Sequence, residues 1–260
     1  MGQIMKGVIM IKGKKFWKFQ AKEDGVGELL LYGEISSYSW WGDEVTPKQF
    51  KADLDALGDV TQINVYINSE GGDVFAGQAI YSMLKRHSAS INVYVDGLAA
   101  SIASVIAMAG DTVYMPKNAM LMIHNPWTIA LGTAEEFRKL ADDMDKIRES
   151  IITVYKDKSD MEEENIIELM DAETWMTAEE AVEFGLADEV EEDKQIAASL
   201  KAGVLMMNGQ QFDLTRFKNP PEQFAASVTP PKEPEPEEEK QDKNLLSLYE
   251  KQIKINENWR

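Results

Sequence analysis

Two residues suited to nucleophilic catalysis, Ser101 and His124, each follow a run of apolar residues that is typical of a buried strand. Ser101 comes after the alternating run at 91–96 and opens a stretch of small and apolar residues, which places its hydroxyl at a strand-to-helix turn. His124 ends a second apolar run, which Pro126 closes. A serine hydroxyl becomes a good nucleophile when a base takes its proton, and histidine has the pKa for that task.

Such a pair needs an acid to orient the histidine and backbone N–H groups to stabilise an oxyanion. Gly71 and Gly72 follow the strand-like run at 63–68 and precede a helical pattern, so their N–H groups can point into a site. Each feature alone has an ordinary explanation, because serine caps helices, buried histidines make structural hydrogen bonds and paired glycines form turns. Their combination, in this order along the chain, indicates a site.

The elements that must position these residues alternate between strand-like and helical patterns. Between the second and third strand-like runs, residues 74–86 place apolar side chains on one helical face. This alternation favours an α/β fold with a largely parallel sheet. The strand-like runs are 28–35, 63–68, 91–96, 112–115 and 119–123.

Three sequence patterns indicate where helices begin. Thr46 precedes a proline and has glutamine at the third helical position, Thr133 pairs with Glu136, and Thr177 pairs with Glu180 in the same spacing. The helix after Thr133 is predicted to run to about residue 158, and its apolar stripe could pack on a neighbouring subunit or equally on its own core. The helix after Thr177 is predicted to end at Gly185.

Composition restricts the chemistry. The 260 residues include no cysteine, which excludes disulfides and thiolate chemistry, and only two histidines, which argues against a catalytic metal centre. The second histidine, His87, follows Lys85 and Arg86 at the end of the helix predicted at 74–86, where positive charge suits the helix dipole, so its role is interpreted as structural.

The net charge of −18 is concentrated in one stretch. Residues 159–193 contain fifteen acidic residues and no lysine or arginine, which argues against binding nucleic acid. We interpret this stretch as a solvated surface, with selection of basic partners as the alternative. The sequence shows neither a signal peptide nor an apolar run long enough to span a membrane, so we expect a soluble, cytoplasmic protein without membrane contacts.

The chain length is compatible with one main domain and appended segments. The segment after residue 228 is rich in proline and glutamate, which is typical of an extended, solvated linker, and we expect the C-terminal tail to be partly disordered. The predicted divisions are an N-terminal extension at 1–27, the main domain at 28–193, a C-terminal extension at 194–228, a linker at 229–243 and a terminal helix at 244–260.

Four segments in order resemble the Clp proteolytic subunit family of serine peptidases. They read NSEGG at 68–72, GLAAS at 97–101, MIHNP at 122–126 and TAEEAVEFGLADEV at 177–190. The resemblance covers about residues 28–192. It implies a fold of the Clp and crotonase type, with stacked parallel-rich sheets, flanking helices and a protruding handle helix.

The resemblance also implies roles for the candidate residues. Ser101 would be the nucleophile and His124 the general base of a serine-type endopeptidase that works through an acyl-enzyme. The N–H groups of Gly72 and Ile102 would form the oxyanion hole. The resemblance implies no cofactor and no metal.

The orienting acid is less clear, because the family places an aspartate four residues before the last of these motifs. Counting back from Thr177 without a gap reaches Glu173, which we prefer, and Asp171 is the second choice. A glutamate can serve as the acid of such a triad.

The resemblance implies protein or peptide substrates and homo-oligomeric rings, expected to be stacked heptamers with the 133–158 helix between them. Family members also work with an AAA+ unfoldase, and whether this chain needs one is open. Its first 27 residues, Trp40-Trp41-Gly42-Asp43 and its C-terminal additions depart from the family pattern. These departures resemble the phage and prophage subgroup of head-maturation proteases, which act on capsid and scaffold proteins.

Two other interpretations are open. The crotonase enzymes share the fold and use a similar oxyanion hole on acyl-CoA thioesters, but they lack the serine and histidine pair. A ring or scaffold subunit that kept the fold without the chemistry is the other, because fold alone does not determine function.

Overall fold

The computed structural model describes residues 15–22, 25–37, 46–192, 198–201, 204–207 and 210–220, and for 198–201 the backbone only. All of them belong to one compact unit spanning Met1–Ser227. The second unit, Val228–Arg260, lies outside the described residues. The predicted linker, terminal helix and disordered tail, and the segment 40–43, therefore also lie outside them.

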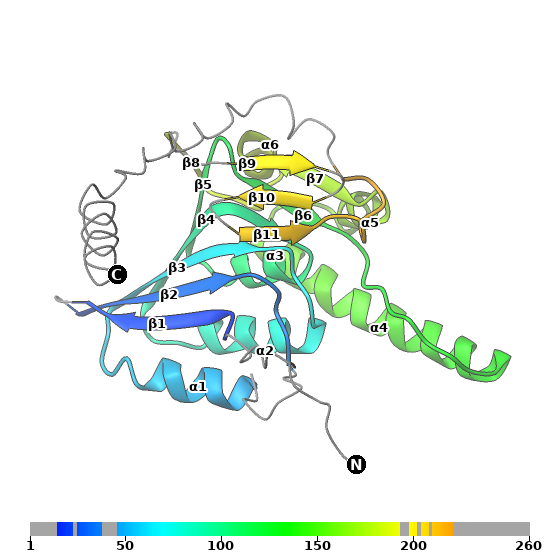
Figure 1. The fold of residues 1–260 in the computed structure, drawn as a ribbon, viewed down its shortest axis with the longest axis horizontal. Helices are drawn as coiled ribbons and strands as arrows, with labels where there is room; N and C mark the ends of the chain where they lie inside the picture. The colour runs from blue at the N-terminus through cyan, green and yellow to red at the C-terminus, as the bar shows by residue number, and fades with distance from the viewer. Residues whose placement is uncertain are drawn as a thin grey trace, which may run out of the picture. The chain divides into compact units, whose positions relative to one another are not determined.

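The main sheet is parallel except for the pairs β1–β2 and β6–β7. This confirms the predicted α/β class with a parallel-rich sheet (Figure 1). Strand β1 pairs antiparallel with β2, whereas the pairs from β2 through β3, β4 and β5 to β8 are all parallel. The strands on this path are β1 (Trp17–Ala21), β2 (Val26–Tyr32), β3 (Gln62–Ser69), β4 (Ser90–Ala100), β5 (Thr112–Pro116) and β8 (Glu189–Glu191).

Strand β4 is the longest strand of the sheet and changes its partner along its length. Its first part, Asn92 to Tyr94, pairs with β5, and its last part, Leu98 to Ala100, pairs with β6 (Met120–Ile123). Strand β6 in turn pairs antiparallel with β7 (Thr174–Thr177). The sheet therefore forks at the carboxyl end of β4, where Ser101 follows.

Six helices lie between and beside these strands in the described part of the chain. The three predicted helix starts are confirmed, because Thr46, Thr133 and Thr177 each form a capping box with the third residue of the helix. Gly185, just after the last of them, has a φ of 71°, a conformation that glycine adopts without strain. The helices are α1 (Pro47–Asp55), α2 (Val74–Lys85), α3 (Ile102–Ala107), α4 (Ala134–Lys158), α5 (Glu163–Asp171) and α6 (Ala178–Glu183).

The long helix α4 is packed on the rest of the unit by one half only. Its buried residues, Ile151, Ile152, Val154 and Tyr155, all lie in the C-terminal half. Its N-terminal half is largely exposed and extends away from the sheet in Figure 1. Its role as a handle between subunits stays a prediction.

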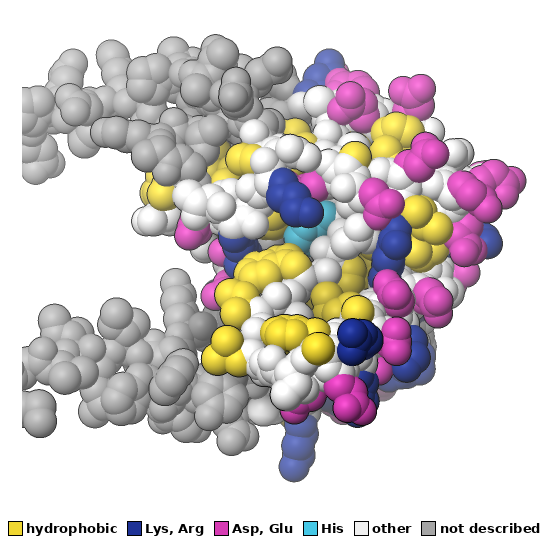
Figure 2. Space-filling model, turned by 90° about the vertical axis from the view of Figure 1, so that its right-hand side faces the viewer, with side chains coloured by type: hydrophobic (Ala, Val, Ile, Leu, Met, Phe, Trp, Pro, Cys, Tyr) yellow, Lys and Arg dark blue, Asp and Glu magenta, His cyan; other side chains and the backbone are white. Residues whose placement is uncertain are grey.

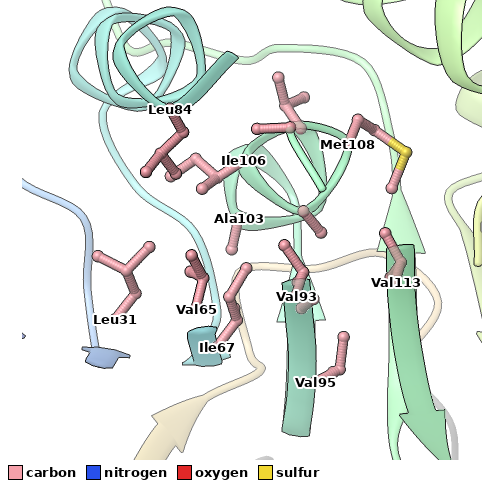
Figure 3. Packing of buried hydrophobic residues seen from close by; sticks show 14 of the residues in the cluster. Leu31, Val65, Ile67, Leu84, Val93, Val95, Ala103, Ile106, Met108 and Val113 are labelled. Carbon is pink, nitrogen blue, oxygen red and sulfur yellow. The ribbon is translucent and has the colours of Figure 1, made fainter. Parts of the chain in front are cut away.

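The core lies between the sheet and helices α2 and α3 (Figure 3). Val65, Val93 and Val113 on neighbouring strands are fully buried, and so are Ala103 and Ile106 on α3. Alternate residues of the strands face this core, which fixes their register because a shift of one residue would turn the apolar side chains outward. The core thereby fixes where each strand ends.

Several strands were not expected from the sequence, and these include β7 and β8 of the main sheet. β1 lies within the predicted N-terminal extension, where lysines interrupt the apolar residues, and it buries Trp17. A separate three-stranded antiparallel sheet lies within the predicted C-terminal extension. It consists of β9 (Ala198–Lys201), β10 (Val204–Met207) and β11 (Gln210–Asp213).

Candidate active site

Strand register brings Ser101 and His124 together. Ala100 on β4 is the partner of Met122 on the parallel strand β6, so the residues that follow the two strands emerge side by side. The N–H of Ser101 continues this ladder by donating to the carbonyl of Met122 at 2.9 Å. His124 Nε2 lies 2.8 Å from Ser101 Oγ, which is a hydrogen bond.

Ser101 has an unusual backbone conformation at the start of α3. Its φ is 57° and its ψ is −130°, and its side chain makes no capping hydrogen bond to the helix. Residues other than glycine are rarely found at positive φ, and such strain is common at functional sites. Among the described residues, only Ser101 and Glu173 of the non-glycine residues have a positive φ. The sharp turn directs the hydroxyl toward His124 rather than into the helix.

The paired glycines lie against this serine. A Cβ added at Gly71 would lie 2.6 Å from Ser101 Cβ, and one added at Gly72 would lie 2.0 Å from the backbone oxygen of Ile35. Both glycines have positive φ, at 92° and 147°. A side chain at either position would therefore be strained and would clash, so glycine is required for this close approach.

Glu173 lies beside the other nitrogen of the His124 ring. Strands β6 and β7 pair Ile123 with Thr174, and one step further along this antiparallel register places Glu173 opposite His124. Its Oε2 lies 3.7 Å from His124 Nδ1, which is longer than a hydrogen bond and becomes an ionic contact when the imidazole is protonated. Its side chain is 6% exposed, so little water screens the interaction between the carboxylate and the imidazole.

Asp171, the second choice for the acid, makes contacts elsewhere. Its Oδ1 accepts hydrogen bonds of 2.7 Å from both Arg148 and Asn125, and its side chain is 56% exposed. The carboxylate that the structure brings to the His124 ring is thus that of Glu173.

Burial lowers the pKa of His124 below its ordinary value. The negative charge of Glu173 opposes this effect, whereas the positive charges of Arg216 and Lys218 add to it. The net result is a neutral imidazole over a wider pH range than for an exposed histidine. A neutral ring with its proton on Nδ1 leaves Nε2 free to accept the proton of the Ser101 hydroxyl.

A cavity of about 330 Å³ opens beside Ser101 and His124. Gly72 lines it, and Ile102, the residue after Ser101, is the first residue of α3. Figure 2 shows one face of the molecule, on which a histidine lies among basic and hydrophobic side chains. The remaining lining residues are Glu34, Glu70, Val74, Pro126, Trp127, Thr128, Ile129, Arg216 and Phe217.

The sequence interpretation missed the contribution of residues 210–220 to this site. Arg216 and Phe217 line the cavity, and the N–H of Asn219 donates to Glu173 Oε1 at 2.7 Å. A signal for this segment does exist, because an Asn-Gly pair at 208–209 follows the apolar run at 204–207 and precedes the mixed segment QQFDL at 210–214, which is typical of a tight hairpin. Nothing in the sequence indicates that the hairpin meets the histidine.

Comparison with known proteins agrees with the parallel-rich α/β fold. The family model described as Clp protease matches residues 42–194. The chain belongs to the Clp protease family. Because Clp proteolytic subunits are serine endopeptidases, the chain is a hydrolase of that type.

Three curated relatives carry the name ATP-dependent Clp protease proteolytic subunit. The relative from Bacteroides fragilis is 34% identical over 154 residues, which cover 57% of this chain and 74% of the relative. That from Bacteroides thetaiotaomicron is 33% identical, with 57% and 70% covered. That from Deinococcus radiodurans is 32% identical over 140 residues, with 53% and 68% covered.

The described part of the chain contains no helix that is both long enough and apolar enough to cross a membrane. Nor do three or more histidine or carboxylate side chains gather there in a way that could hold a metal ion.

Proposed function

We propose that this serine endopeptidase acts through Ser101, His124 and Glu173. Ser101 Oγ attacks the carbonyl carbon of a peptide bond while His124 Nε2 takes the hydroxyl proton. The tetrahedral intermediate collapses to an acyl-enzyme on Ser101, and the same imidazolium protonates the leaving amine. A water molecule, deprotonated by His124, then hydrolyses the ester and restores the serine.

Glu173 has two tasks in this scheme. Its carboxylate holds the Nδ1–H tautomer and stabilises the imidazolium that forms when the proton is transferred. The 3.7 Å contact would shorten as the ring becomes charged, because the attraction between opposite charges is stronger in a buried site.

The oxyanion hole in this proposal consists of the N–H groups of Gly72 and Ile102. Gly72 lines the cavity next to Ser101, and Ile102 begins helix α3 directly after it. Two backbone donors near the serine would bind the oxygen that becomes negative during attack.

The 2.8 Å hydrogen bond between His124 and Ser101 is the observation that carries the proposal. A serine-reactive phosphonate probe tests it. We expect the wild type to be labelled and Ser101→Ala to be unlabelled and to lose peptide hydrolysis by at least about 10³-fold. Ser150→Ala, which changes an exposed serine of α4, serves as the control and should be labelled normally.

Labelling that survives Ser101→Ala would contradict the proposed nucleophile. A wild type that is neither labelled nor able to cleave casein would favour the inactive scaffold subunit instead. Self-cleavage within 194–240 in the wild type but not in Ser101→Ala would independently support the peptidase.

We propose further that the chain assembles into rings, in the form of stacked heptamers with α4 as the handle. Exposed apolar side chains support this, because Ile129 and Leu131 before α4 are 85% and 99% exposed and Phe137 on α4 is 47% exposed. Apolar surface of this kind is typical of protein interfaces. Light scattering after size exclusion should show a large oligomer for the wild type and for Lys117→Asp, and smaller species for Leu131→Asp. A monomeric wild type would contradict it.

We propose head maturation, with capsid or scaffold proteins as substrates, as the biological setting. The support is the added sheet of β9, β10 and β11, which lies beyond the matched residues 42–194. Cleavage of a folded scaffold protein without ATP and without an AAA+ unfoldase would support this setting. Cleavage of folded substrates only with an unfoldase and ATP would contradict it and would indicate general protein degradation.

A further inference from the structure

The segment after β11 contacts the site through Phe217. The ring of Phe217 lies edge-on to the ring of His124, with 5.7 Å between the ring centres, and also edge-on to Trp175 at 5.4 Å. Phe217 is 6% exposed. An apolar ring in this position covers the imidazole and limits the access of water to it.

The same segment also holds the carboxylate of Glu173. The N–H of Asn219 donates to Glu173 Oε1 at 2.7 Å, while the Oε2 atom of the same carboxylate faces His124 Nδ1. The side chain of Asn219 donates to the carbonyl of Ala172 at 2.9 Å. The carboxylate therefore has one oxygen fixed by residue 219 and the other directed at the base.

Several separate contacts hold this segment in place. Asp213 Oδ1 accepts from the N–H and the hydroxyl of Thr215, which makes the turn after β11. Arg216 donates to the carbonyl of Glu70 at 3.2 Å and lies over the ring of Phe217 at 5.2 Å. The turn and the arginine together place Phe217 on the wall of the cavity.

The small sheet is itself anchored beside the nucleophile motif. A Cβ at Gly97 would lie 2.2 Å from Met207 Sδ, so β10 packs directly on the strand that leads to Ser101. Leu205, Met207 and Phe212 are fully buried. The sheet β9–β11 and residues 214–220 are thus packed against the site rather than appended to the surface.

We propose that residues 204–207 and 210–220 complete the active site, with Phe217 and Asn219 as positioning residues for His124 and Glu173. The inference rests on the proposed triad and goes beyond it, because these residues follow the matched range 42–194. The N–H of residue 219 keeps the carboxylate directed at Nδ1, and Phe217 keeps the imidazole desolvated. Neither residue touches the reacting atoms.

A pH effect follows from the groups around the imidazole. The charges that act on His124 are the carboxylate of Glu173 and the positive charges of Arg216 and Lys218, and Glu34 and Glu70 line the same cavity. Removing the Phe217 ring would admit water and favour the charged imidazolium. The acid limb of kcat/KM would then move to higher pH.

The experiment compares variants in the full chain, with kcat expressed per active site titrated by the phosphonate. Asn219→Pro removes the N–H donor, whereas Asn219→Ala keeps it and removes only the bond to Ala172. We expect kcat to fall roughly tenfold to a hundredfold in Asn219→Pro, as for loss of a hydrogen bond to a charged group, with KM within about twofold. Asn219→Ala should remain close to the wild type.

Phe217→Ala should lower kcat and shift the acid limb to higher pH, and Phe217→Leu should restore part of both, because leucine also excludes water. Gln211→Ala, at an exposed position of β11, is the control and should change neither. If Asn219→Pro does not fold, the two Phe217 variants alone test the proposal.

Wild-type kcat per titrated site and an unchanged acid limb in the Phe217 variants would overturn the inference, even if the variants are less stable to heat. Failure of the triad itself would appear differently. In that case Ser101→Ala would still be labelled, whatever the variants at 217 and 219 do.

Discussion

The candidate site is built from two regions that hold their residues in different ways. The ends of β4, β6 and β7 carry Ser101, His124 and Glu173, and their positions follow from continuous strand pairing. The segment 210–220 carries Phe217 and Asn219, which reach the site through ring contacts and hydrogen bonds rather than through strand pairing. The proposed triad thus lies at strand ends of the main sheet within the family match, while Phe217 and Asn219 come from the segment that follows the small sheet.

The largest effect that tests this division is expected at Glu173. Glu173→Gln should lower kcat by roughly 10³- to 10⁴-fold, because the amide favours the wrong tautomer of His124 and cannot stabilise the imidazolium. Asp171→Asn is the matched control, and we expect a change within about twofold because its contacts are on the surface. Peptide hydrolysis at saturating substrate measures both.

Equal, undiminished activity in the two variants would show that the site works without an orienting acid. A loss in Asp171→Asn alone would transfer the role to Asp171 and would contradict the assignment by strand register.

The next effect concerns the close packing at the sheet end. Gly72→Ala should lower the free energy of unfolding by about 3 kcal/mol, since the new methyl would meet the backbone of Ile35 at a strained φ. Gly58→Ala also places alanine at positive φ but meets nothing within 4 Å, so about 1 kcal/mol is expected. Urea unfolding of both variants measures the difference, and equal losses would contradict the packing argument.

The smallest effect is a pair of opposite shifts in the pH profile. Activity requires neutral His124, so kcat/KM falls as the pH drops through the pKa of this residue, and burial should place this limb below the ordinary histidine value of about 6.5. Glu173→Gln removes a negative charge that raises the pKa, so the limb should move to lower pH. Arg216→Gln removes a positive charge that lowers it, so the limb should move to higher pH.

Shifts in the same direction in both variants would contradict the opposite effects of Glu173 and Arg216 on the pKa of His124. Residual activity of Glu173→Gln should suffice for the measurement, because the pH midpoint of the acid limb is determined from relative rates.

The sequence predicted the sheet-borne part of the site because strand ends are local features. The apolar runs before Ser101 and His124 show where two neighbouring parallel strands stop, and the family motifs identify the pair. The count back from Thr177 reaches the residue opposite His124 because the β6–β7 pairing has no bulge between Met120 and Ile123. The catalytic roles themselves stay predictions.

The other region could not be predicted in the same way. The contact between Asn219 and Glu173 joins residues 46 positions apart and uses a backbone N–H, which every residue except proline possesses. In the sequence, Phe217 is a single apolar residue in a polar segment, and nothing distinguishes it as part of a site. Strand β1 was missed for a related reason, since Lys15 and Lys18 flank its buried Trp17 and hide the alternation.

The fork of the sheet at β4 also has a consequence for how the protein unfolds. Strand β4 pairs with β3, β5 and β6. The strand that leads to Ser101 therefore also joins the two branches of the sheet, one through β5 and one through β6. Its amides should be among the slowest to exchange with deuterium, because they open only when the whole unit opens. Displacement of Ser101 and global unfolding should then be a single cooperative event.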